Sequence, residues 1–175
     1  MAEQALVLIT GGGTGGHVFP GLAAADALQS LGARVHWLGT RSGMEARLVP
    51  AAGIPISYLR VSGIRGKQRW YQVLAPLLLI TAVAQALLVL LRTRPQCVLG
   101  TGGFVAGPGA LAAWLLRAPV VVHEQNAIAG TTNRLLAHIA RRILTGLPGP
   151  FAADARTRNV GNPVRAAIAA MTPPR

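Results

Sequence analysis

A glycine-rich segment, residues 11–16, constrains this chain more than any other feature. It follows a short apolar run, residues 5–10, of the kind that forms a strand buried on both faces of a parallel sheet. An alanine- and leucine-rich stretch, residues 21–31, comes next, and Pro20 is expected in the first turn of that helix, where its missing N–H is harmless. Another apolar run, residues 34–38, completes a strand–loop–helix–strand order. This order predicts a βαβ unit.

The same alternation continues along the chain. Further strands are expected at residues 56–61, 96–100, 119–123 and 142–145. Further helices are expected at residues 44–52, 70–91 and 131–140, with another that ends at residue 116, and a turn is expected at residues 159–163. The predicted fold class is therefore α/β, with a Rossmann-like, doubly wound, mostly parallel sheet and helices on both faces.

The glycine segment has a weaker echo, because residues 14–18 and residues 101–105 each join an apolar strand to an alanine-rich helix. In a parallel sheet both loops would lie at the carboxyl edge, where open α/β sheets bind ligands. Glycines let backbone N–H groups approach a phosphate, and a helix N-terminus adds positive potential. We therefore predict phosphate-binding loops. The acid of a dinucleotide fingerprint is missing, since the second strand leads into Arg41; NAD is not expected, and an NADP-dependent oxidoreductase stays an alternative.

Two groups of polar residues are candidates for chemistry. His17 directly follows the first glycine loop, where it is either a general base or anion contact, or a helix-terminal histidine in a hydrogen bond. Residues 123–126 (HEQN) end an apolar strand, which favours a site over a scaffold. They do not form H-E-x-x-H, because Ala127 stands at the place of the second histidine. With Cys97 as the single cysteine, no metal site or disulfide framework is predicted.

The charge is strongly positive, with 17 Lys+Arg against 5 Asp+Glu and a formal net charge of +12. Such a charge favours polyanionic partners, namely nucleic acid, anionic lipid or anionic small molecules. Aromatic residues make up only 5% of the chain, too few for the stacking platforms of a nucleic-acid-binding module, so no nucleic-acid partner is expected. The first residues lack a basic region and a long apolar core, so a cytoplasmic start is expected.

Residues 70–91 carry no charge, and Arg69, Arg92 and Arg94 flank them. A helix of that length reaches about 33 Å, enough to cross a bilayer. Its place between two strands argues instead for a crossover helix. An apolar helix flanked by arginines fits shallow insertion into an anionic leaflet, with Leu78 and Leu79 as expected contacts. Peripheral contact, a plain core helix and a true span all remain open here.

Four motifs together resemble the MurG family, the undecaprenyl-diphospho-muramoylpentapeptide N-acetylglucosaminyltransferases of bacterial cell-wall synthesis. They are residues 12–21 (GGTGGHVFPG), 102–108 (GGFVAGP), 123–126 (HEQN) and 161–165 (GNPVR). The resemblance covers nearly the whole chain, with the motifs in order and at similar spacing.

The resemblance implies the amino-terminal half of a GT-B glycosyltransferase, with residues 1–162 as the acceptor-side domain and residues 163–175 as the start of an interdomain linker. The carboxy-terminal nucleotide-binding domain is expected to be missing, so this piece alone should be inactive. The implied reaction is inverting transfer of GlcNAc from UDP-GlcNAc to the muramoyl 4-hydroxyl of lipid I, giving lipid II for peptidoglycan. No cofactor or catalytic metal is implied. The implied location is peripheral, on the cytoplasmic face of the bacterial inner membrane, against an anionic membrane surface.

The resemblance also implies roles for single residues. His17 is a candidate base or diphosphate contact, and Glu124 is the second candidate for the catalytic base. The implied contacts to substrates are Thr14, Gly15 and Gly16 in the first loop, Asn126 and Arg165 at the sugar nucleotide, and Asn133 near the acceptor. Gly102, Gly103 and Phe104 form the implied loop for the acceptor diphosphate. Many members have tyrosine where this chain has Phe104, so a role for a phenol hydroxyl is not carried over.

Overall fold

The computed structural model describes residues 4–61 and 75–164. Within these residues seven parallel strands form a single sheet in the order β3-β2-β1-β4-β5-β6-β7. The strands are β1 Leu6–Gly11, β2 Arg34–Thr40, β3 Ile56–Leu59, β4 Cys97–Gly102, β5 Val120–Glu124, β6 Arg142–Thr145 and β7 Thr157–Asn159. The order reverses at β1 and β4, which defines a switch point at their carboxyl ends.

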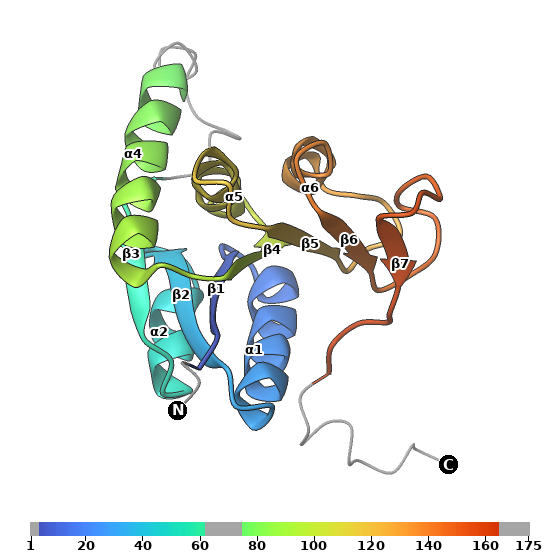
Figure 1. Cartoon of the computed structure of the whole chain (residues 1–175), viewed down its shortest axis with the longest axis horizontal. Helices are drawn as coiled ribbons and strands as arrows, with labels where there is room; N and C mark the ends of the chain where they lie inside the picture. The colour runs from blue at the N-terminus through green and yellow to red at the C-terminus, as the bar shows by residue number, and fades with distance from the viewer. Residues whose placement is uncertain (1–3, 62–74, 165–175) are drawn as a thin grey trace.

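Helices cover both faces of the sheet. Figure 1 shows α1 and α2 on one face and α4, α5 and α6 on the other. Their bounds are α1 Gly15–Ser30, α2 Glu45–Ala51, α4 Ala75–Thr93, α5 Ala106–Leu115 and α6 Thr131–Leu136. The predicted doubly wound α/β fold is confirmed.

The apolar runs follow from this double cover. Successive strand residues point to opposite faces, and in β1 the neighbours Leu8 and Ile9 are both fully buried. Leu8 packs into the core under α4 and α5, whereas Ile9 packs with Trp37 and Val49 under α1 and α2. Both faces of the strand therefore require apolar side chains, which is why the sequence shows a continuous run instead of alternation.

The start of α1 differs from the prediction. The helix begins at Gly15 rather than at residue 21, so Pro20 lies inside it and not in its first turn. The N–H groups of His17 and Val18 already bond to the Thr14 carbonyl, at 3.1 and 3.2 Å. Two glycines and a proline have low helix propensity, which hid these turns from a pattern-based prediction.

Two further boundaries were wrong. Helix α6 ends at Leu136 rather than at residue 140, and the next residues form turns in which the Ala140 N–H bonds to the Leu136 carbonyl. Strand β7 falls where the sequence predicted no strand, because Thr157–Asn159 is a short polar segment at the sheet edge. An edge strand of this kind has no buried face to give it an apolar pattern.

Helix α4 is half covered. Its buried residues, Ala82, Val83, Ala86 and Leu90, lie on one stripe that faces the core. Large apolar residues recur on the other side at helical spacing and are exposed: Leu77, Ile80, Leu88 and Leu91. By length and composition alone this is the one helix among the described residues that could cross a membrane, and 17% of its most apolar window is buried. Residues 70–74 of the predicted helix lie outside the described residues.

Candidate functional site

The two glycine loops both lie at the carboxyl edge of the sheet, as the sequence predicted, and there they touch each other. The Gly12 N–H donates to the Gly102 carbonyl across a distance of 3.4 Å. Gly103 has a φ of +80°, and a Cβ on it would lie 2.2 Å from the Gly12 carbonyl oxygen. Only glycine fits at this position, because a side chain would collide with backbone that cannot move aside.

His17 lies between the two glycine loops. Its Nδ1 is 3.0 Å from the Thr101 carbonyl oxygen, and a Cβ on Gly102 would lie 2.7 Å from the same nitrogen. A carbonyl only accepts, so Nδ1 donates in this bond, and in the neutral ring with this tautomer Nε2 has the lone pair. No partner for Nε2 is found in the described part of the chain. His17 is thus both the hydrogen-bonded histidine of the structural alternative and a ring whose second nitrogen can accept a proton.

Glu124 is a fully buried carboxylate with four hydrogen-bond donors. Oε1 accepts from the backbone N–H and the side-chain amide of Asn126, at 3.0 and 2.9 Å. Oε2 accepts from the Gly130 N–H at 3.0 Å and the Asn133 amide at 2.9 Å. Burial raises the pKa of Glu124, but these hydrogen bonds, beginning with the Asn126 N–H, outweigh it and hold the pKa below its ordinary value. This geometry favours a positioning role over the catalytic role predicted for Glu124.

The asparagines around Glu124 differ in how free they are. Asn133 is buried, and its amide also donates to the His123 carbonyl at 3.2 Å. Asn126 is exposed, so its remaining polar atom is available to a ligand. The side-chain nitrogen of Asn133 lies beside Gly102, at 3.3 Å from the place of a Cβ. The structure therefore brings Asn133 to the second glycine loop, and Asn126 to the surface beside it.

The end of β5 is also tied to the segment after β7. His123 Nε2 is 3.2 Å from the Gly161 carbonyl oxygen, and the Asn162 amide donates to the Gln125 carbonyl at 3.2 Å. Burial lowers the pKa of His123, against smaller opposing effects of the Gly161 carbonyl and the Glu124 charge. Three buried polar atoms at this edge lack a partner in the described residues: Thr101 Oγ1, Gln125 Oε1 and Asn133 Oδ1. Such atoms are expected to meet water or a ligand.

The sequence prediction missed a second buried carboxylate, Glu45, in the first turn of α2. It is fully buried, and its Oε2 accepts from the Gly13 N–H at 3.0 Å. Its Oε1 accepts from the N–H and the hydroxyl of Thr40, at 2.9 and 2.7 Å. Glu45 therefore joins the first glycine loop to the end of β2. The one available signal was rarity, since the chain has only 5 Asp+Glu.

The other predicted residues are placed as follows. Thr14 and Gly16 are exposed and Gly15 is half-buried at the start of α1, where the first N–H groups have no partner within the helix. Phe104 is half-buried and lies 3.5 Å from the place of a Cβ on Gly13. Arg165 lies outside the described residues.

Of the two predicted membrane contacts, Leu79 is 45% exposed, whereas Leu78 is half-buried and lines a cavity. Leu78 is therefore less available for a membrane contact than Leu79, because it lines this cavity together with the end of β3.

No cluster of three or more His, Cys, Asp or Glu side chains that could hold a metal ion occurs in residues 4–61 and 75–164. The phosphate-type features at the edge are backbone groups: the glycine loops and the start of α1. What the edge offers chemically is a set of N–H donors for an anion and one imidazole nitrogen beside them.

Comparison with known proteins gives a consistent result. The chain matches the glycosyltransferase family 28 N-terminal domain over residues 7–145. It is 59% identical over 162 residues to the UDP-N-acetylglucosamine--N-acetylmuramyl-(pentapeptide) pyrophosphoryl-undecaprenol N-acetylglucosamine transferase of Alkalilimnicola ehrlichii, covering 93% of this chain and 45% of the relative. The Methylococcus capsulatus protein of the same name is 56% identical over 162 residues, covering 93% of this chain and 46% of the relative. The chain thus spans about half the length of these curated relatives.

Solved structures agree. The crystal structure of Acinetobacter baumannii MurG is similar with a TM-score of 0.77 and 41% identity, over 87% of this chain and 44% of that one. The Streptomyces glycosyltransferase SsfS6 is similar with a TM-score of 0.60 and 16% identity, over 83% of this chain and 51% of that one, which shows the shared fold alone.

Proposed function

The chain belongs to glycosyltransferase family 28, whose N-terminal domain it matches, and on this premise we propose that it is the acceptor-side half of an N-acetylglucosaminyltransferase. The resemblance to MurG enzymes seen in the sequence is confirmed by the identity to curated relatives and by the MurG crystal structure. The proposed reaction transfers GlcNAc with inversion from UDP-GlcNAc to the muramoyl 4-hydroxyl of lipid I. The product, lipid II, serves peptidoglycan synthesis.

The observation that carries the proposal is the meeting of two glycine loops at His17. Inversion requires one displacement, in which a base removes the proton of the acceptor hydroxyl while its oxygen attacks the anomeric carbon and UDP leaves. The Nδ1 hydrogen bond to the Thr101 carbonyl leaves Nε2 as the proton acceptor. The loop N–H groups of Gly15 and Gly16 then bind a diphosphate.

Glu124 acts on this site through its neighbours. Both of its oxygens are occupied, so it holds the loop after β5 and orients Asn126 toward the sugar nucleotide. Asn133 is buried against the same carboxylate and shapes the edge beside Gly102 instead of contacting the acceptor in the open.

The direct test is an assay of the full-length protein with UDP-GlcNAc labelled in the sugar and a lipid I analogue. We expect the label to appear in a disaccharide product. The control donor is UDP-glucose, which lacks the acetamido group of UDP-GlcNAc. If no GlcNAc reaches the acceptor in any buffer or detergent, the proposed activity is refuted.

The proposal includes peripheral attachment to the cytoplasmic face of the bacterial inner membrane through α4. Its support is the exposed apolar stripe that contains Leu77, Ile80, Leu88 and Leu91, with Trp114 of α5 50% exposed as well. The exposed Arg92 lies at the end of the same helix. Each basic residue near an anionic surface contributes about 1 kcal/mol, over a screening length of about 8 Å at physiological salt.

Flotation with liposomes tests the attachment. Binding of the full-length protein should require anionic lipid, weaken with salt, and fall in the Leu77→Asp and Leu79→Asp variants. Leu31→Asp is a matched control, because Leu31 is 84% exposed at the end of α1 on the other face of the sheet. Wild-type protein that ignores anionic liposomes at low salt would make α4 an ordinary crossover helix. Protein that resists extraction with alkaline carbonate would instead indicate a true span.

A further inference from the structure

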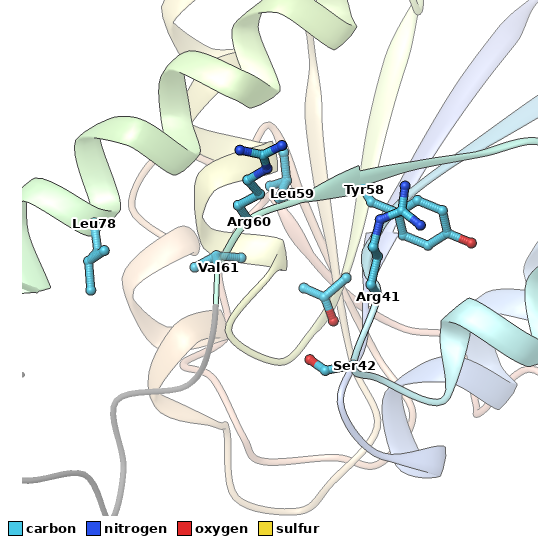
Figure 2. Close-up of a pocket in the computed structure, with 8 residues that line it drawn as sticks. Arg41, Ser42, Tyr58, Leu59, Arg60, Val61 and Leu78 are labelled. Atoms are coloured by element: carbon cyan, nitrogen blue, oxygen red, sulfur yellow. The ribbon is translucent and has the colours of Figure 1, made fainter.

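A cavity of about 510 Å³ lies at the same carboxyl edge of the sheet. It is separate from the two glycine loops and the loop after β5, which form the candidate site. It opens at the ends of β2 and β3, and Leu78 of α4 closes one side. Figure 2 shows the residues that line it: Arg41 and Ser42 from the segment after β2, and Tyr58 and Arg60 from β3 and its end. The proposed glycosyl transfer, as described above, does not involve the residues of this cavity.

Arg41 is held in a defined position in this cavity. Its guanidinium carbon lies 4.8 Å from the centre of the Tyr58 ring, and Figure 2 shows the two side chains stacked. A stacked guanidinium keeps its N–H donors free at its edge, where they match both oxygens of a carboxylate.

The positive charge in the cavity is not compensated. Its lining contains Arg41 and Arg60 and no acidic side chain. In the described part of the chain the one salt bridge joins Arg156 to Asp154, just before β7. Strand β7 is at the opposite edge of the sheet from β3. Neither cavity arginine therefore has an acidic partner among the described residues. The backbone N–H of Arg60 donates to Gln85 Oε1 at 2.8 Å, which fixes the end of β3 against α4. Two guanidinium groups at one fixed cavity favour an anion.

The cavity is connected to the first glycine loop through Glu45. Thr40 lies in the lining and gives its hydroxyl proton to Glu45 Oε1, while Oε2 of the same carboxylate accepts from the Gly13 N–H. The Glu45 carboxylate therefore links the cavity lining to the first glycine loop, which binds the diphosphate in the proposed function. Because its proton is already used, the Thr40 hydroxyl can only accept from a ligand.

Resting on the proposed function, we propose that this cavity binds the peptide of the lipid-linked acceptor, with Arg41 and Arg60 holding the terminal carboxylate of that peptide. The relatives' name assigns a pentapeptide to the acceptor, and any such peptide ends in a carboxylate. A peptide also offers N–H donors, from which the Thr40 hydroxyl can accept, and carbonyls for the hydroxyls of Ser42 and Tyr58. A phosphate offers only acceptors and fills a small part of a cavity of about 510 Å³. The lining therefore fits a peptide better than a lipid phosphate.

The test compares two acceptors in the full-length enzyme at saturating UDP-GlcNAc. Both are short-chain lipid I analogues, and they differ in whether the pentapeptide ends in a carboxylate or in an amide. Wild-type KM should be about tenfold higher or more for the amide, in line with the strength of charge-assisted hydrogen bonds. Arg41→Gln and Arg60→Gln should raise KM for the carboxylate acceptor by a similar factor, and together they should remove the difference between acceptors. The kcat should stay unchanged.

Arg47→Gln is the matched control, because Arg47 is an exposed arginine of α2 that does not line the cavity. Equal wild-type KM values for the two acceptors would overturn the inference, and so would variants that raise both KM values alike. Weaker flotation with anionic vesicles at unchanged KM would assign the cavity to a lipid phosphate and also overturn it. Wild-type enzyme that transfers GlcNAc to neither acceptor would refute the proposed function itself, and this inference with it.

Discussion

Two fully buried carboxylates organise the carboxyl edge of the sheet, and they do so over very different spans of chain. Glu124 takes all four of its donors from Asn126, Gly130 and Asn133, within nine residues. Glu45 reaches back 32 residues to the Gly13 N–H, besides its two bonds to Thr40. Glu124 thus shapes one loop, whereas Glu45 ties two strand ends together.

The contrast changes the interpretation of the glycines. A Cβ on Gly12, Gly39 or Gly43 would lie 2.3, 2.6 or 2.0 Å from an atom of Glu45. These three glycines make room for a carboxylate of the protein. One of them, Gly12, belongs to the segment at residues 11–16, which the sequence analysis interpreted as a phosphate-binding loop. Gly16 is different, since nothing but the Thr14 hydroxyl lies within 4 Å of its Cβ position. One glycine-rich loop therefore contains a glycine packed against the protein, Gly12, and a glycine that faces open space, Gly16.

Gly12→Ala against Gly16→Ala should separate the two kinds of glycine with the largest effect. The new methyl group at residue 12 would collide with the Glu45 carboxylate, so the free energy of unfolding should fall by about 3 kcal/mol or more. At residue 16, inside α1, alanine should be neutral or stabilising by up to about 1 kcal/mol. Urea unfolding of both variants measures the difference. Equal destabilisation of the two would show that Glu45 is not what excludes a side chain at residue 12.

His17 bonds to neither carboxylate among the described residues, so it should affect rate and not stability. His17→Ala in the full-length enzyme should lower kcat by about 10²-fold or more if Nε2 is the base. The melting temperature should stay nearly unchanged, because the ring is half-buried and, among the described residues, makes one hydrogen bond, to a backbone carbonyl. Steady-state kinetics with a melting curve decide the matter. Wild-type turnover would leave His17 with a structural role alone.

Glu45→Gln and Glu124→Gln compare how much stability each carboxylate contributes, the one that bonds to a remote loop and the one that bonds within its own loop. In each variant one amide NH₂ faces a backbone N–H that has lost its acceptor, which costs about 2 kcal/mol of unfolding free energy. Glu124→Gln can be relieved in part, since the Asn126 and Asn133 side chains can rotate their amides. Glu45 also accepts from two backbone N–H groups, but only one side-chain donor beside it can turn, the Thr40 hydroxyl, so Glu45→Gln should be the more destabilised variant. Chemical unfolding at pH 7 gives the ranking, and the reverse order would contradict it.

The same contrast explains what the sequence could predict. The strands other than β7 and the HEQN segment were predicted because their signals are local: apolar runs for β1 and β5, and a polar string at the end of β5. Glu45 was missed because its partner Gly13 is remote in the chain, and a lone glutamate at the start of a short helix is ordinary. The start of α1 was misplaced because contact between the glycine loops, and not helix propensity, decides its first turn.

The smallest expected effect is an acid sensitivity at the end of β5. Burial lowers the pKa of His123 below its ordinary value of 6.5, so the unfolded chain binds this proton more readily than the folded one. The stability that His123 contributes is complete above pH 6.5 and is lost as the pH falls through the lowered folded-state pKa. The pKa of Glu124 is also lowered, but from 4.5, so its contribution is lost only in stronger acid.

His123→Gln should therefore flatten the dependence of unfolding free energy on pH between 7 and 5. Part of the slope should remain, because burial lowers the pKa of His36 as well, and His36→Gln should remove that part. Denaturant unfolding at several pH values measures both slopes, and an unchanged slope in His123→Gln would show that this histidine does not sense acid in the folded protein.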